Sequence, residues 1–434
     1  MIPIPESKHP RIIIIGGGFA GVKLVKKLKN LPVQIVLFDR NNYHTFQPLL
    51  YQVATAGLEP DSIADPLRKQ LEPVKNFFFR MAEVYSVDGA SNMIHTEIGV
   101  LDYDYLVIAT GSRTNFFGNE SIMQHAFALK QIPQALDLRS HILQNFEAAT
   151  ITEDPLEKKS RMNIVIVGGG PTGVEVAGAL GELKRSILPK DYPELDFSKM
   201  SIILLEGSSS LLGGMSDFAS EKALKYLKKF HVDVYLDTLV KSYDGHSALL
   251  SNGEEINTHT VVWAAGVKGN YPDGLKESSL ERDRIVVDHY NRVAEYDNIF
   301  AIGDIAMMKS EGYENGHPML APVAIQQGNH MAMNLKRLLK GEELKPFKYF
   351  DKGSMATVGR NKAVVDLPGK SSLGGFPAWV IWMFVHLISI IGFRNKLIVF
   401  LNWVWNYFTY DKGTRLIIRK FIPKKLRKTE PELT

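Results

Sequence analysis

Residues 11–21 read RIIIIGGGFAG, a run of β-branched residues followed at once by closely spaced glycines. The isoleucines predict a buried strand, and residues 22–28 predict a helix after the glycines. A second strand is expected over residues 33–38, and it ends at Asp39, 18 residues after Gly21. This order of strand, glycine turn, helix, strand and acidic residue is typical of a dinucleotide-binding unit.

The same order recurs later in the chain. Residues 162–167 predict a strand, GGGPTG follows at 168–173, and a helix is expected to start near Val174. The next strand, residues 201–205, ends at Glu206, which lies 33 residues after Gly173. The usual spacing is about 20 residues, and an insertion over residues 183–200 accounts for the difference.

Each glycine of the two patterns has its own physical purpose. The first permits a tight turn, the second lets a pyrophosphate approach the backbone, and the third allows close helix–strand packing. The helix N-terminus adds free N–H groups, and the acid accepts from a ribose hydroxyl. Because Glu206 would repel a 2′-phosphate, the second site favours NADH over NADPH. We therefore predict two dinucleotide sites, one at Gly16, Gly18, Gly21 and Asp39 and one at Gly168, Gly170, Gly173 and Glu206.

The remaining patterns are weaker. Residues 132–149 and 324–339 predict helices, and residues 150–160 predict a polar linker. Short strands are expected over residues 233–236, 261–264, 285–288 and 299–302.

Length and charge limit the architecture. The 434 residues are enough for two or three domains, and 45% hydrophobic with 23% charged residues is ordinary for a globular protein. The net charge of +4 is unevenly distributed, because residues 412–428 hold eight basic residues and no acidic one. Subtracting these eight from 51 leaves 43 basic residues against 47 acidic ones, so the rest of the chain is mildly acidic.

The chain contains no cysteine. This excludes disulfides, iron–sulfur clusters, thiolate metal sites and a cysteine nucleophile. The histidines show no metal-ligand spacing, so no metal is expected. Only MIPIPESKHP precedes the first strand, so we expect no signal or transit peptide and a protein that stays where it is made.

Five segments together resemble the two-dinucleotide-binding flavoprotein family: GGGFAG at 16–21, ATG at 109–111, GGGPTGVE at 168–175, WAAGV at 263–267 and AIGD at 301–304. In that family the N-terminal fold binds FAD, an inserted fold binds NAD(P)H, and the aspartate of the GD motif, here Asp304, contacts FAD. Many members pass electrons through cysteines beside the flavin. Because this chain has none, its acceptor must be diffusible or another protein.

Within that family the chain resembles the type II, non-proton-pumping NADH:quinone oxidoreductases, through YHTFQPLLYQVATAG at 43–57, GGGPTGVE and LAPVAIQQG at 320–328. The last segment is similar to the family's quinone-site pattern A-Q-x-A-x-Q, with Ala321, Ala324 and Gln326 in place. Pro322 stands where the first glutamine belongs. The resemblance implies that NADH delivers a hydride to N5 of FAD and that two electrons then pass to a quinone.

The resemblance also assigns domains and residues. It implies an α/β fold of two Rossmann-like domains, with an FAD domain at 1–120 and 285–352, an NADH domain at 160–284 and a C-terminal membrane-association domain at 353–434. Expected FAD-binding residues are Gly16, Gly18, Phe19, Ala20, Gly21, Asp39, Arg40, Tyr51, Gln52, Ala109, Thr110, Gly111, Gly303, Asp304 and Ala324. Expected NADH-binding residues are Gly168, Gly170, Pro171, Thr172, Gly173, Glu175, Glu206, Ala265 and Gly266. Glu175, Gln326 and Gln327 are expected to position or protonate the quinone.

Residues 371–410 carry only two charges, Arg394 and Lys396, and four of the five tryptophans. Residues 376–393 form an uncharged run that would reach about 27 Å as a helix, against a hydrocarbon core of roughly 30 Å. A spanning helix, and a buried hairpin or dimer contact, are therefore left open. The aromatic content and the short apolar segment at 396–408 favour an interfacial anchor, in which residues 376–428 contact an anionic membrane surface.

We therefore expect a peripheral, monotopic flavoenzyme of a respiratory chain, on the cytoplasmic face of a bacterial cell membrane, with no nucleic-acid partner and a homodimer left open. One alternative is a soluble NADH-dependent reductase for a small redox protein or oxygen. It would keep its quinone turnover in liposomes after truncation near residue 370. Another is an NADH-sensing binding protein, which would consume NADH negligibly.

Overall fold

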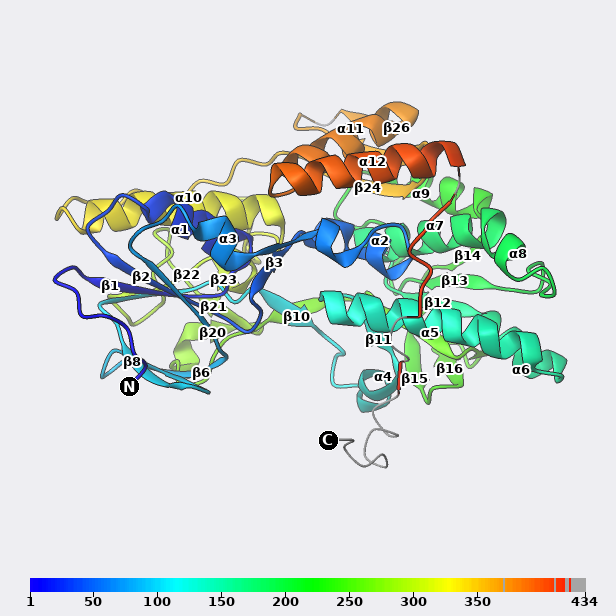
Figure 1. The fold of residues 1–434 in the computed structure, drawn as a ribbon, viewed down its shortest axis with the longest axis horizontal. Coiled ribbons are helices and arrows are strands. Elements are labelled where there is room, and N and C mark those ends of the chain that lie inside the picture. Colours follow the sequence, from blue (N-terminus) through cyan, green and yellow to red (C-terminus); the bar gives the residue numbers. More distant parts are fainter. Residues whose placement is uncertain (370, 410, 418–420, 423–434) are drawn as a thin grey trace. The chain divides into compact units, whose positions relative to one another are not determined.

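The computed structural model describes residues 1–369, 371–409, 411–417, 421 and 422, and it contains two compact units (Figure 1). Unit 1 consists of Met1–Thr45, Ala64–Arg113 and Val267–Asp351. Unit 2 consists of Phe46–Ile63, Thr114–Gly266 and the described part of Lys352–Thr434. The basic residues Arg419, Lys420, Lys424, Lys425, Arg427 and Lys428 lie outside the described residues.

Unit 1 is built on a parallel sheet whose strands follow the order β22-β9-β1-β2-β5. Its central strand β1 (Arg11–Ile15) carries the isoleucine run. Ile12 and Ile14 pack in a core with α1 and α10, whereas Ile13 and Ile15 belong to a second core on the other face. Both faces are buried, which explains a continuous β-branched strand without polar alternation.

Unit 1 also contains the other four strands of this sheet, several shorter strands and three α-helices among the described residues. Its helices are α1 (Phe19–Leu28), α3 (Leu67–Leu71) and α10 (Ala321–Leu338). Its other strands are β2 (Gln34–Asp39), β3 (Tyr43–Thr45), β4 (Ala64–Pro66), β5 (Phe77–Met81), β6 (Val84–Asp88), β7 (Met93–Thr96), β8 (Gly99–Asp102), β9 (Tyr105–Ile108), β19 (Val267–Gly269), β20 (Leu280–Glu281), β21 (Arg284–Val286), β22 (Ile299–Ala301) and β23 (Ala306–Met307). Strand β10 (Ser112–Thr114) leads from unit 1 into unit 2.

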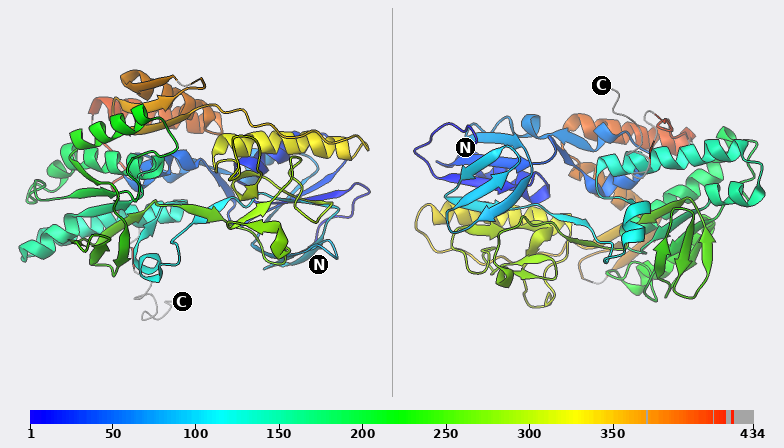
Figure 2. Two further views of the ribbon diagram at one scale, coloured as in Figure 1. Left: turned by 180° about the vertical axis from the view of Figure 1, so that it is seen from behind. Right: turned by 90° about the horizontal axis from the view of Figure 1, so that it is seen from below.

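Unit 2 repeats the same plan. Its parallel sheet has the order β11-β18-β12-β13-β14, with the strand before the second glycine motif again central. Its strands are β11 (Phe127–Ala128), β12 (Ile164–Val167), β13 (Ile202–Leu205), β14 (Val232–Tyr235), β15 (Val240–Tyr243), β16 (Ser247–Leu250), β17 (Glu255–Asn257), β18 (Thr260–Trp263), β24 (Ser354–Gly359), β25 (Lys362–Asp366) and β26 (Ser372–Gly375). Its helices are α2 (Leu50–Ala54), α4 (Glu120–His125), α5 (Ile132–Ile151), α6 (Pro155–Met162), α7 (Pro171–Ser186), α8 (Leu188–Asp191), α9 (Asp217–Lys229), α11 (Phe376–Ser389) and α12 (Phe393–Thr409). Figure 2 shows both sheets from two further sides.

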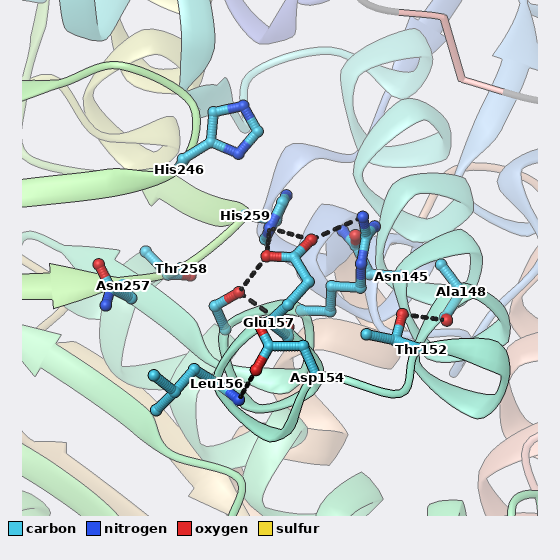
Figure 3. A network of polar contacts seen from close by, with 12 residues as sticks. Asn145, Ala148, Thr152, Asp154, Leu156, Glu157, His246, Asn257, Thr258 and His259 are labelled. Carbon is cyan, nitrogen blue, oxygen red and sulfur yellow. Dashed lines mark hydrogen bonds and ion pairs between the residues drawn. The ribbon is translucent and has the colours of Figure 1, made fainter.

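The polar linker expected at residues 150–160 is wrong, because most of it is helical. α5 continues to Ile151, and α6 starts at Pro155 with Asp154 as its N-cap, accepting from the N–H of Leu156 at 3.0 Å. Glu157 forms an ion pair with Arg161 on the same helix at 2.7 Å. Figure 3 shows Glu157 beside His259, which it contacts at 3.3 Å. The sequence Asp-Pro is a helix-start signal that explains this boundary.

Three expected helix starts were also several residues late. α1 begins at Phe19, α7 at Pro171 and α10 at Ala321, not near 22, 174 and 324. In α7 and α10 a proline occupies the first turn, where its missing N–H leaves no hydrogen bond unmade. Each of the two glycine-rich turns therefore passes directly into its helix.

The apolar run at 376–393 is not one helix. α11 ends at Ser389, the backbone turns at Gly392 with φ +83°, and α12 begins at Phe393. In the described part of the chain, no helix combines the length and the apolar character needed to cross a membrane. After α12, residues 411–417 lead away from α11 and α12 (Figure 1). The Phe421 ring lies 4.9 Å from that of Phe127 in β11.

Candidate active site

The first glycine motif forms a cradle at the carboxyl end of β1. Gly16 has φ +110°, and a Cβ there would lie 2.3 Å from the carbonyl oxygen of Ala109. A Cβ on Gly21 would lie 1.9 Å from the carbonyl oxygen of Gly16, so α1 can approach β1 only with glycine at this position. At Gly18, by contrast, a Cβ would meet nothing within 4 Å. Open space therefore adjoins the uncapped N-terminus of α1 at the position where a pyrophosphate is expected.

The peptide groups of Gly17 are held on both sides. Its N–H donates to Oδ2 of Asp39 at 2.6 Å, and its carbonyl oxygen lies 3.0 Å from Nδ1 of His44. Because C=O and N–H point in opposite directions across a trans peptide, the bond from His44 directs the N–H of Gly18 away from the histidine. Burial lowers the pKa of His44 to about 4, so the ring is neutral and Nδ1 carries the donated proton. Burial also raises the pKa of Asp39, although two backbone N–H bonds oppose this.

The ends of β9 and β22 complete the cradle in unit 1. Asp304 follows β22 and accepts from the hydroxyl of Ser112 at 2.6 Å. Gln327 of α10 is fully buried and accepts from the N–H of Gly303 at 2.7 Å, whereas its Nε2 has no partner within the described residues. Ala324 packs near Gly303, and Ala109, Thr110 and Gly111 follow β9. Ligands of open parallel sheets bind at these carboxyl ends.

These features fit FAD. The open position at Gly18, the free helix N-terminus and the unpartnered buried amide of Gln327 are all suited to a bound dinucleotide. Arg40 is exposed and pairs with Glu83 at 3.4 Å. Two of the residues expected to bind FAD, Tyr51 and Gln52, belong instead to unit 2.

The second cradle has the same geometry. Gly168 has φ +108° and would carry a Cβ 2.6 Å from Ala265, and a Cβ on Gly173 would lie 1.8 Å from the carbonyl oxygen of Gly168. A Cβ on Gly170 would meet no atom within 4 Å, as at Gly18. Pro171 and Thr172 lie exposed at the start of α7, and Gly266 follows β18 near the ring of Phe117.

The acid of the second cradle is placed as its counterpart is in the first. Oε2 of Glu206 accepts from the N–H of Gly169 at 2.5 Å, and Oε1 accepts from the N–H of Ser208 at 2.8 Å. The carbonyl oxygen of Gly169 accepts from the backbone N–H of Leu212 at 2.9 Å. A backbone donor thus occupies the role that the side chain of His44 has in unit 1.

Glu175 lies one turn into α7 and is buried, with 8% of its surface exposed. The N–H of Thr357 in β24 donates to Oε1 at 3.5 Å. Burial raises the pKa of Glu175 to about 8, and the polar groups of Thr357 and Trp382 only partly offset it. The carboxyl group therefore carries a proton at neutral pH.

A chain of polar side chains lies in the same unit. The indole N–H of Trp403 in α12 donates to Oε1 of Gln52 at 2.9 Å, and Nε2 of Gln52 donates to the hydroxyl of Tyr51 at 3.0 Å. Burial and the nearby Glu175 raise the pKa of Tyr51 well above its usual value. Trp382 of α11 is 2% exposed and stacks on His386, with centroids 4.2 Å apart. Trp403 thus connects the predicted Gln52 to α12, and its ring lies 5.6 Å from that of Trp382 in α11.

Comparison with known proteins decides the family. Residues 10–328 match the model of the pyridine nucleotide-disulphide oxidoreductases, and residues 352–410 match the NDH2 C-terminal domain. Type II NADH:quinone oxidoreductase Ndh of Mycobacterium tuberculosis is 34% identical over 428 residues, which cover 94% of this chain and 90% of that protein. The chain belongs to the type II NADH:quinone oxidoreductases. The enzyme of this name from Staphylococcus aureus is 30% identical over 84% of this chain and 91% of its own length.

The solved structures agree on the fold of this type II enzyme. The structure of NDH2 from Plasmodium falciparum in complex with NADH superposes with a TM-score of 0.86 at 21% identity, covering 95% of this chain and all of that one. The predicted family, the α/β fold with dinucleotide-binding domains, the enzyme class, and FAD, NADH and quinone as cofactor and substrates are thereby confirmed.

Gln326, which completes the quinone motif, and the adjacent Gln327 differ in their surroundings. Gln326 is paired with the backbone of Phe350, donating from Nε2 at 2.9 Å and accepting at Oε1 at 3.0 Å. The buried Nε2 of Gln327 has no hydrogen-bond partner among the described residues, so both of its N–H groups are unpaired there. Pro322, the departure from the motif, lies in the first turn of α10.

Our sequence reasoning missed several residues that surround the predicted ones. His44 and Leu212 hold the two glycine peptides, and Thr357, Trp382 and Trp403 adjoin Glu175 and Gln52. The enrichment of tryptophan at 371–410 was a usable signal, because it left a buried hairpin open beside the interfacial anchor that it favoured. Nothing local indicated His44, because its partner lies 27 residues away.

Proposed function

We propose that this chain oxidises NADH and reduces a quinone by way of FAD, with Glu175 supplying a proton to the quinone. FAD, when bound, accepts the hydride of NADH and releases two electrons to the quinone, which also takes up two protons. The glycine cradles and the acids Asp39 and Glu206 hold the two dinucleotides. Gln327, next to the quinone motif, has an amide Nε2 without a partner among the described residues, and Gln326 fixes the segment around Phe350.

One observation carries the proposed role of Glu175: its carboxyl group is buried and has a pKa of about 8. A general acid works best when its pKa lies near the working pH. A surface glutamate would be ionised at pH 7 and could not donate. Asp304 and Glu206 are candidates for cofactor contacts rather than proton transfer, because both lie at strand ends beside the glycine motifs.

Substitution of Glu175 by glutamine should separate the two half-reactions. We expect anaerobic stopped-flow to show reoxidation by a short-chain quinone slowed about 100-fold, the usual contribution of a general acid, and flavin reduction by NADH slowed much less. Glu175→Asp keeps a carboxyl group and should recover part of the rate. Rates equal to wild type in both half-reactions would refute this role.

The pH dependence gives a second readout. The carboxyl group donates only while protonated, so the wild-type reoxidation rate should be flat below pH 8 and fall above it. In Glu175→Gln the lower rate should not change over this range. A wild-type rate that rises above pH 8 would contradict a donor.

We also propose that α11 and α12 contact a membrane surface from the cytoplasmic side of a bacterial cell. This is supported by large apolar side chains on their outer faces, which include Phe384 at 63%, Phe393 at 81%, Trp405 at 62% and Phe408 at 76% exposure. Water-exposed apolar patches of this kind mark interaction sites. Aromatic residues are favoured at the headgroup level of a bilayer.

Replacing Phe393 and Phe408 with serine should weaken flotation with phosphatidylcholine vesicles at least tenfold, because each phenyl group contributes about 1.5–3 kcal/mol when buried. The matched control is the pair Ile151→Ser and Leu156→Ser, which are 84% and 74% exposed on α5 and α6. Unchanged vesicle binding, with loss of a dimer in sedimentation, would show instead that another copy covers this face.

A further inference from the structure

A basic pocket of about 420 Å³ opens on unit 2 beside the end of α12. Its wall combines the last turn of α7, α8, Phe230 after α9 and the turn between β24 and β25. It is lined by Glu182, Arg185, Ser186, Lys190, Phe230, Arg360, Asn361 and Lys362. Four of these eight residues are cationic and one is acidic, so the pocket has an excess of positive charge.

The cations are incompletely neutralised. Within the described residues no ion pair is formed by Arg185, Lys190 or Lys362. The acid, Glu182, already accepts from the backbone N–H of Arg360. Nζ of Lys362 lies 4.6 Å from the centroid of the Phe230 ring, which holds the ammonium group at the wall. Burial lowers the pKa of Lys362. The negative charge of Glu182 opposes this shift, and the like charges of Lys229 and Arg185 add to it.

Arg360 ties the pocket to the membrane-facing helices. Its guanidinium donates to the carbonyl oxygens of Tyr407 at 2.9 Å and Asn406 at 2.5 Å, at the C-terminal end of α12. The exposed Trp405 and Phe408 belong to the same turn. The pocket is therefore linked through Arg360 to the turn of α12 that carries these exposed aromatic side chains.

In its described part the basic tail begins beside the pocket, where the charge of Lys412 interacts with those of Glu182 and Arg360, and then leaves it. Arg415 pairs with Asp191 at 2.6 Å, and the N–H of Phe421 donates to Gln144 of α5 at 2.7 Å. The segment thus runs from the end of α12 away from α11 and α12 (Figure 2).

We propose that this pocket binds the phosphate of an anionic phospholipid headgroup, with Arg185, Lys190 and Lys362 as its cationic contacts. This inference rests on the membrane association proposed above. Phosphate oxygens accept charge-assisted hydrogen bonds from both arginine and lysine. The pocket would make membrane binding selective for anionic lipid, whereas the apolar face of α11 and α12 would bind neutral lipid as well.

The test compares the intact FAD-loaded enzyme with the triple variant Arg185→Gln, Lys190→Gln, Lys362→Gln. Binding is measured by flotation with phosphatidylcholine vesicles, with and without phosphatidylglycerol. Each cation near an anionic surface contributes about five-fold in affinity. We expect the variant to bind mixed vesicles on the order of 100-fold more weakly and pure phosphatidylcholine vesicles equally well. Lys241→Gln, an exposed lysine on β15, and truncation after Ile422 control for charge elsewhere on the chain.

The outcomes separate the two proposals. A wild-type enzyme that binds neither kind of vesicle would refute the membrane surface itself. Two results would overturn the proposal for the pocket and leave the membrane surface standing. In one, the triple variant binds mixed vesicles as tightly as wild type. In the other, only the chain truncated after Ile422 binds mixed vesicles more weakly. In a further result, inorganic phosphate raises the melting temperature of wild type and not that of the triple variant, while vesicle binding is independent of phosphatidylglycerol. That result would show a site for free phosphate and overturn the lipid assignment.

Discussion

At the scale of single residues, the two dinucleotide cradles solve one problem with different donors. The N–H of each middle glycine, Gly17 or Gly169, donates to an acid, Asp39 or Glu206. The carbonyl oxygen of the same glycine accepts a hydrogen bond from a second group. In the cradle proposed for NADH that group is the backbone N–H of Leu212, a residue held at φ +54°. In the cradle proposed for FAD it is the imidazole of His44, which can be substituted without changing the backbone.

His44→Leu should therefore weaken FAD retention while leaving NADH binding intact. Losing the bond to Gly17 frees the peptide that directs the N–H of Gly18, and a buried hydrogen bond of this kind is worth about 1–3 kcal/mol. When the FAD-loaded His44→Leu variant is diluted, we expect it to lose FAD at a protein concentration roughly 10–100-fold higher than wild type does. The KM for NADH should be unchanged. His44→Asn retains an N–H near Nδ1 and should restore retention. Equal FAD loss in both variants would indicate only a packing role.

At the scale of elements, α7 is placed by glycine as much as by its apolar side chains. A Cβ on Gly178 would lie 2.1 Å from the carbonyl oxygen of Val358, so α7 and β24 are in backbone contact there. Glu175 lies one turn earlier on the same helix face, opposite Thr357. The close approach of helix and strand is therefore what buries the carboxyl group and raises its pKa.

Gly178→Ala should be destabilising, although alanine normally stabilises a helix by about 1 kcal/mol relative to glycine. Overpacking against a fixed backbone costs about 1–3 kcal/mol, which urea unfolding can measure. Gly214→Ala, where a Cβ would meet nothing within 4 Å, is the control and should change stability little. A Gly178→Ala variant more stable than wild type would contradict the described packing.

The sequence could predict the elements whose signals are local. The isoleucine run, the glycine turns and the acids at strand ends lie within short segments, so their spacing gave the two cradles. Asp154 and Pro155 also signalled a helix start, but the charged composition favoured a linker. The environment of Glu175 was beyond such reasoning, because its hydrogen-bond partner Thr357 is 182 positions away. Burial and the resulting pKa arise only when α2, α7, β24, α11 and α12 pack together.

At the scale of the whole molecule, the net charge of +4 conceals a mildly acidic body and a basic tail. The structure adds a second cationic feature, the pocket beside α12, that no local run of basic residues reveals. The absence of cysteine also determines electron storage, because no dithiol can hold electrons between NADH and the acceptor. The flavin must be the sole two-electron store, and the quinone must take electrons from it.

An anaerobic absorption titration of the purified enzyme tests this central claim most directly. One equivalent of NADH per FAD should bleach the flavin band completely, and one equivalent of a short-chain quinone should restore it. A requirement for more than one NADH, or a bleached flavin that quinone leaves unchanged, would contradict the account.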